Sequence, residues 1–125
     1  MKQHLLGRQL KDIEYEHRIT LLSLVTGLTR EYLMDEYPRD CKNEEESLLK
    51  YGYDVKVGEL IEIIQDYTGR FPAPSIKNNN YEVTVKLEDS NDSEIEIKSG
   101  VKETYCDALY EIVKFLLKND YIELA

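Results

Sequence analysis

The side chains that most often carry out catalysis or bind metals are few in this chain and widely separated. His4 and His17 are its only histidines, and Cys41 and Cys106 its only cysteines. Both histidines fall on one expected helix, where about 100° per residue places them roughly 140° apart around the axis. They therefore cannot converge on one metal ion or substrate. His17 falls on the apolar stripe of that helix, where a satisfied core or interface histidine is the simpler interpretation.

No histidine is close in sequence to either cysteine, and no serine stands in a nucleophile-elbow pattern. The sequence thus predicts no catalytic site, no metal site and no cofactor, and we expect a protein that is not an enzyme. A Cys–His pair assembled by the fold is the alternative left open.

A polar run at 89–94 superficially resembles a calcium-binding loop. It lacks the glycine expected at the sixth position, and Gly100 stands where the bidentate glutamate of such a loop would be. We interpret the run as a polar turn. The glycines at 52, 58 and 69 are isolated, so no glycine-rich phosphate-binding loop is expected.

One basic stripe could contact nucleic acid. Arg8, Lys11 and Arg18 share a face of the expected first helix, with Tyr15 between them. Acidic residues stand beside them, and the whole chain has a formal net charge of −9, which repels phosphates at long range. We therefore expect ion pairs on a solvated helix face, and no direct binding to nucleic acid.

The best candidate site is an acidic centre, a set of carboxylates and tyrosines concentrated between positions 31 and 54. Tyrosines provide contact area at interfaces, and carboxylates complement arginine and lysine. The segment thus predicts docking on a basic surface of another protein, such as a nucleic-acid-binding one. The alternative is a helix–loop–helix whose acids simply face water. The candidate residues are Glu31, Tyr32, Asp35, Glu36, Tyr37, Asp40, Glu44, Glu45, Glu46, Tyr51, Tyr53 and Asp54.

A second candidate is the segment 70–80, in which two prolines and three asparagines favour a loop. Arg70, Phe71 and Lys77 are the residues of this loop that suit partner binding. The alternative is that Phe71 packs into the core.

Helices are expected through most of the first half of the chain. Apolar residues recur at spacings of three and four from 3 to 35. A single helix of that length would be about 50 Å long. Either it breaks near Arg18–Thr20 or at Gly27, or it projects and pairs with a second copy, which would make a homodimer through this helix. Further helices are expected at 43–51 and at 56–68.

Strands are expected in the second half. Apolar and polar residues alternate at 81–87 and again at 94–98, which predicts a β-hairpin with a turn at 88–93. A lone hairpin is marginal in water, so helices must cover its apolar face or another chain must extend it. A helix is expected at 103–118, and a short third strand is an option at 121–124.

These elements predict an α+β fold and a single domain over 1–125. It would comprise a helical half at 1–69, a loop at 70–80 and a ββα half at 81–125. At 125 residues the chain can bury a core without disulfides or metals. Its apolar stretches are far shorter than the ~20 residues of a membrane span, and its first residues do not resemble a signal peptide. We expect a cytoplasmic protein with reduced thiols.

In size, acidity and lack of active-site residues the chain resembles, in class only, the small acidic proteins of phages and mobile elements, such as anti-CRISPRs, other anti-defence inhibitors and immunity proteins. The leading hypothesis is a non-enzymatic inhibitor or regulator that occupies a basic surface of a partner protein. A homo-oligomer that binds a small ligand between subunits, and a structural or assembly protein, are the alternatives.

Overall fold

The structure is a computed structural model that describes residues 3–36, 55–88 and 93–122. It is an α+β fold with a three-stranded antiparallel sheet, as the sequence predicts. The chain forms two compact units. The N-terminal unit is His4–Lys56, and the C-terminal unit consists chiefly of Val57–Glu123. The expectation of one domain over 1–125 stays a prediction.

Where the chain is described, the N-terminal unit has three short helical segments instead of the one long helix expected over 3–35. They are the 3-10 helix η1 at Gly7–Asp12, the helix α1 at Tyr15–Thr26 and the helix α2 at Arg30–Glu36. The first break comes at Ile13, whose backbone is extended (φ −119°, ψ 156°). The second comes at Gly27, where φ is 77°. This left-handed conformation is accessible to glycine at little cost. The break at Gly27 is therefore confirmed, whereas Arg18–Thr20 lies within unbroken helix.

Side-chain hydroxyls fix the turn between α1 and α2. The Ser23 hydroxyl donates to the Leu28 carbonyl at 2.7 Å, and the Leu28 amide donates to Thr26 Oγ1 at 3.2 Å. Thr29 then caps α2, because its hydroxyl accepts from the Tyr32 amide at 3.1 Å. α1 and α2 pack on each other, and Ile19, Leu22 and Leu33 of these helices are fully buried.

The two ends of the N-terminal unit are tied together by backbone pairing. The Leu5 amide donates to the Val55 carbonyl at 2.8 Å, and His4 and Lys56 form an antiparallel bridge. Leu5 and Val55 are both fully buried. The chain thus enters and leaves this unit at adjacent positions. The helix expected at 43–51 lies outside the described residues.

The C-terminal unit begins with the helix α4, Val57–Thr68, which confirms the prediction for 56–68. It ends at Gly69, whose φ of 71° is again left-handed. The buried side of α4 carries Leu60, Ile63 and Ile64.

The sheet has the order β1-β2-β3, with β1 at Pro74–Lys77, β2 at Asn80–Glu88 and β3 at Glu94–Lys98. The predicted hairpin of β2 and β3 is confirmed. The loop expected over 70–80 is partly wrong, because β1 lies within it and pairs with β2. The connecting residues Asn78 and Asn79 have φ of 51° and 66°. Two successive positive φ values define the type I′ turn that suits a two-residue hairpin.

The third strand is therefore β1, and the strand considered at 121–124 does not form where the chain is described. Tyr121 and Ile122 are in no strand, and 123–124 lie outside the described residues.

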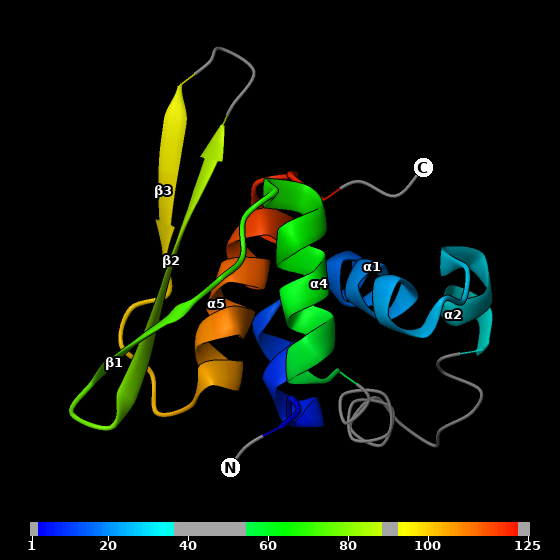
Figure 1. Ribbon diagram of the computed structural model, residues 1–125. Coiled ribbons are helices and arrows are strands. Elements are labelled where there is room, and N and C mark those ends of the chain that lie inside the picture. Colours follow the sequence, from blue (N-terminus) through cyan, green and yellow to red (C-terminus); the bar gives the residue numbers. More distant parts are fainter. Residues whose placement is uncertain (1–2, 37–54, 89–92, 123–125) are drawn as a thin grey trace. The chain divides into compact units, whose positions relative to one another are not determined.

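The helix α5, Tyr105–Lys118, covers the apolar face of the sheet (Figure 1). Thr104 caps it by accepting the Asp107 amide at 3.0 Å. α5 packs on β2 and β3, and α4 packs on α5 and on β2. Helices thus cover the hairpin, as expected. The buried core residues of this unit include Val83, Val85, Leu87, Ile97, Leu109, Ile112, Val113 and Leu116.

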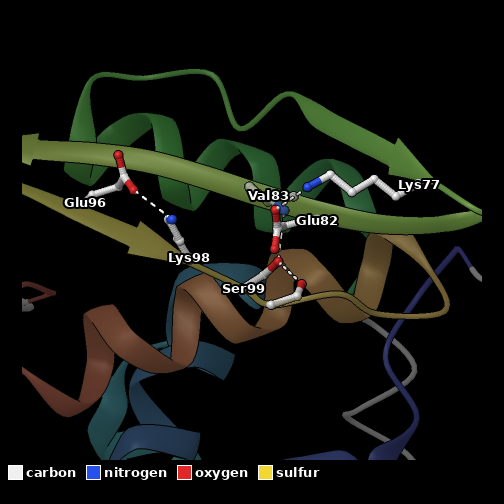
Figure 2. Close-up of polar contacts among 7 residues, drawn as sticks. Lys77, Glu82, Val83, Glu96, Lys98 and Ser99 are labelled. Carbon is white, nitrogen blue, oxygen red and sulfur yellow. Dashed lines mark hydrogen bonds and ion pairs between the residues drawn. The ribbon is translucent and has the colours of Figure 1, made fainter.

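A β-bulge at Ser99–Gly100 extends the pairing of β2 beyond the end of β3, as far as Tyr81. Regular pairing with β3 ends at Thr84↔Lys98, and pairing resumes one residue out of register at Tyr81↔Lys102. Between these points the Ser99 amide donates to the Val83 carbonyl at 2.9 Å. The Ser99 hydroxyl accepts the Val83 amide at 2.8 Å and donates to the Gly100 carbonyl at 2.6 Å (Figure 2). The hydroxyl thus takes the place of a strand carbonyl.

Candidate functional site

Most of the predicted acidic centre lies outside the described residues. Glu31, Tyr32, Asp35 and Glu36 belong to α2, and the side chain of Glu36 is not described. The other candidates, Tyr37, Asp40, Glu44, Glu45, Glu46, Tyr51, Tyr53 and Asp54, lie outside the described ranges. The structure therefore positions only the first part of this site.

That first part is the exposed side of α2. Tyr32 is 49% exposed and Met34 is 45% exposed, and Glu31 and Asp35 are exposed beside them. Leu33 points the other way and is fully buried. We call Glu31, Tyr32, Met34 and Asp35 the α2 surface. An aromatic ring, a thioether and two carboxylates in one helix of seven residues are a combination that suits a protein interface.

Hydrogen bonds hold the start of α2, the helix that carries the α2 surface. Thr29 caps the helix, and the Arg30 guanidinium donates to the Thr20 hydroxyl of α1. Arg30 is the first residue of α2 and is only partly exposed, whereas the carboxylates of Glu31 and Asp35 are exposed. This arrangement leaves the surface with net negative charge and an accessible aromatic side chain.

Sequence periodicity misplaced two apolar side chains here. Leu28 and Tyr32 continue the stripe of the expected long helix, yet Leu28 is 38% exposed and Tyr32 49% exposed. The left-handed backbone at Gly27 redirects the chain, and the face that would have been buried turns to solvent. Met34 was missed as a candidate, and only its position beside Glu31 and Asp35 could have signalled it.

The second candidate loop is held against α5 rather than loose. The Tyr105 hydroxyl donates to the Pro72 carbonyl at 2.6 Å, and the Ala73 amide donates to the Phe71 carbonyl at 3.0 Å in a γ-turn. Burial desolvates the Tyr105 phenol and raises its pKa above the usual 10.0. Pro72 is buried and Phe71 is 59% exposed. Phe71 therefore does not pack into the core.

The two cations of this loop have nearby carboxylates. Arg70 lies 3.8 Å from Glu94, with both side chains about half exposed. Lys77 lies 3.4 Å from Glu82 (Figure 2). Exposed pairs of this kind contribute about 0–1 kcal/mol. They balance charge locally, so Phe71 is the side chain of this loop best placed for contact with a partner.

The basic stripe is divided between elements. Arg8 and Lys11 belong to η1, whereas Arg18 and Tyr15 belong to α1, with the guanidinium 5.8 Å from the ring centroid. The expectation that they share one helical face is wrong, because Ile13 interrupts the helix. His4 precedes η1, so it lies outside any described helix, and its backbone forms the bridge with Lys56.

The remaining candidate groups are dispersed. His17 is partly buried, and within the described ranges its Nδ1 has no hydrogen-bond partner. Cys106 is buried in α5, and Cys41 lies outside the described residues. No three His, Cys, Asp or Glu side chains gather as a metal site would require in the part of the chain that the structure covers. None of the helices described is both long and apolar enough to cross a membrane.

No protein-family model, curated protein or solved structure matches this chain.

Proposed function

We propose that this protein is a non-enzymatic binding protein that occupies a basic surface of another protein and blocks it. The α2 surface is the observation that supports the proposal. It combines exposed carboxylates with an exposed tyrosine on a helix that Thr29 and Arg30 hold in place. A rigid aromatic anchor loses little entropy on binding, and the surrounding carboxylates select arginine and lysine.

The rest of the acidic centre extends this surface in sequence. The residues from 37 to 54 add further carboxylates and tyrosines, and the proposal includes them as contact residues. With a net charge of −9, the protein would be steered towards a cationic partner, and added salt would slow association. A surface that itself binds nucleic acid is the kind of partner that fits best. Blocking it would make this an inhibitor of the anti-defence or immunity type.

The test is recovery of the tagged protein from its native cells at low salt, followed by mass spectrometry of what accompanies it. The proposal expects a stoichiometric basic protein that salt releases. Binding to that purified protein is then measured for Glu31→Lys and Tyr32→Ala. Glu62→Lys, at an exposed position of α4, makes the same charge change elsewhere.

We expect both α2 variants to weaken binding at least about tenfold, as truncation of an interface anchor does, while Glu62→Lys changes it much less. Equal effects of Glu31→Lys and Glu62→Lys would show that only net charge matters, and the α2 surface would be the wrong site. A partner without a basic surface would refute the mechanism.

A further inference from the structure

The α2 surface carries an oxidisable side chain. The sulfur-bearing residues of the chain are Met1, Met34, Cys41 and Cys106. Cys106 is fully buried, and Met1 and Cys41 lie outside the described residues. Met34 is 45% exposed. Among the described residues, its thioether is therefore the sulfur that a dissolved oxidant can reach.

The geometry of α2 places Met34 at one side of the α2 surface. With about 100° per residue, Glu31 and Asp35 lie about 40° apart around the helix axis. Leu33 lies about 160° from each of them and is fully buried, so the two carboxylates face solvent. Met34 lies about 60° beyond Glu31 on one side. Tyr32 lies about 60° beyond Asp35 on the other side, so a partner that docks on the α2 surface also covers Met34.

The hydrogen bonds that hold α2 do not involve the side chain of Met34. Thr29 caps the helix, and the Arg30 guanidinium donates to the Thr20 hydroxyl. Leu33 is the side chain of α2 that is buried. Methionine oxidation disrupts a protein core because it makes an apolar side chain polar. At the exposed Met34 water can hydrate the added oxygen, so we expect the fold to tolerate oxidation.

We propose that Met34 is a modification site at which oxidation to the sulfoxide blocks binding of the basic partner, an inference that rests on the proposed function of the α2 surface. The oxidant is a hydroperoxide such as hydrogen peroxide. Its O–O bond breaks and an S=O bond forms, so the sulfur is oxidised and hydrogen peroxide is reduced to water. Sulfoxide reductases reverse the modification. Two thiols are then oxidised to a disulfide, and the oxygen leaves as water.

Oxidation opposes binding because the sulfoxide oxygen loses its water when a partner covers it. A thioether is apolar and flexible, and it adapts to an irregular contact surface. A polar oxygen that is covered without a hydrogen-bond partner makes the same contact unfavourable. The bound partner in turn shields the sulfur, so Met34 should be oxidised more slowly in the complex than in the protein alone.

The first measurement needs no partner. Protein with Cys41→Ser is treated with hydrogen peroxide, and peptide mapping by mass spectrometry follows the oxidation of Met34 separately from that of Met1. We expect Met34 to react within about tenfold of the rate of N-acetylmethionine amide, because susceptibility follows exposure. The far-ultraviolet circular dichroism should not change. A slower reaction, or a loss of helix on oxidation, overturns the proposal.

The second measurement is binding to the basic protein recovered with the tagged chain, again in the Cys41→Ser background. Oxidation should raise the dissociation constant at least about tenfold, and a sulfoxide reductase should restore it. Met34→Gln, which makes this side chain permanently polar, should also weaken binding. Met34→Leu has a side chain of similar volume without a sulfur. Its dissociation constant should be the same before and after peroxide treatment, although Met1 is still present.

The outcomes separate this inference from the proposed function. If Glu31→Lys and Tyr32→Ala weaken binding but oxidation does not, the α2 surface is the contact site and Met34 is not a switch. If peroxide weakens binding of Met34→Leu as much as that of its parent, another residue is responsible and the inference is overturned. If no basic protein is recovered, or if none of these changes affects its binding, both proposals fail.

Discussion

Replacing Ser99 by alanine tests the role of the β-bulge in the C-terminal unit. The Ser99 hydroxyl is the acceptor of the Val83 amide, at 2.8 Å. Val83 is fully buried and Ser99 is 7% exposed, so water cannot easily replace the lost acceptor. A buried donor left without a partner costs about 1–3 kcal/mol. The bond from Ser99 to the Gly100 carbonyl adds little, because Gly100 is exposed and water can hydrate that carbonyl.

We therefore expect Ser99→Ala to lower the free energy of unfolding by about 1–3 kcal/mol, measured by urea denaturation and circular dichroism. Ser75→Ala is the matched control, because Ser75 is exposed on β1, and it should change the value by less than about 0.5 kcal/mol. Hydrogen exchange gives a local readout. The Val83 amide should lose more protection than the Val85 amide, which lies within regular pairing to Ile97. Equal stabilities for Ser99→Ala and Ser75→Ala would refute the reasoning.

Three further substitutions test other parts of the fold. Gly27→Ala forces a left-handed φ of 77° on a residue with a side chain and should destabilise by about 1 kcal/mol. Gly58→Ala, in the first turn of α4 with open space around it, should instead stabilise by up to about 0.5 kcal/mol, and urea denaturation of both variants checks the pair. Asn79→Gly, at φ 66° in the type I′ turn, should raise the thermal midpoint, since Asn-Gly is the favoured sequence there. Tyr105→Phe removes the bond to Pro72 and should cost about 1 kcal/mol. Because burial raises the pKa of Tyr105 above 10.0, the stability that this phenol contributes is complete below pH 10.0 and is lost as the pH rises through its folded-state pKa. Denaturation across alkaline pH should show the gap between wild type and Tyr105→Phe closing, and a constant gap would contradict this account.

The sequence specified the hairpin of β2 and β3 well, because a period of two in 81–87 and 94–98 has few other interpretations. It specified β1 poorly. All four residues of β1 are exposed, so no alternation marks a buried face, and Pro74 suggested a loop. The successive asparagines Asn78 and Asn79 suit a two-residue hairpin turn, and this was the signal that could have revealed the strand.

The same limit applied to the candidate sites. Apolar spacing runs on through Gly27, yet a single left-handed residue ends α1 and exposes Leu28 and Tyr32. The spacing of apolar residues does not reveal the change of chain direction that this residue causes. For Phe71 the sequence left burial and exposure equally open. The structure fixes this loop through Pro72, whose carbonyl accepts a hydrogen bond from the Tyr105 hydroxyl. Tyr105 lies 33 positions from Pro72 in the sequence, so local sequence could not reveal this contact.

The paired ends of the N-terminal unit bear on how such a chain can change. The amide of Leu5 donates to the carbonyl of Val55. The segment between these residues therefore begins and ends at adjacent positions. Segments with adjacent ends can be inserted, exchanged or lengthened without stretching the chain that carries them. By this geometry, a related protein could keep α4, the sheet and α5 while replacing the whole of 5–55. The sequence of the acidic centre could then change from one related protein to another without any change in the sheet.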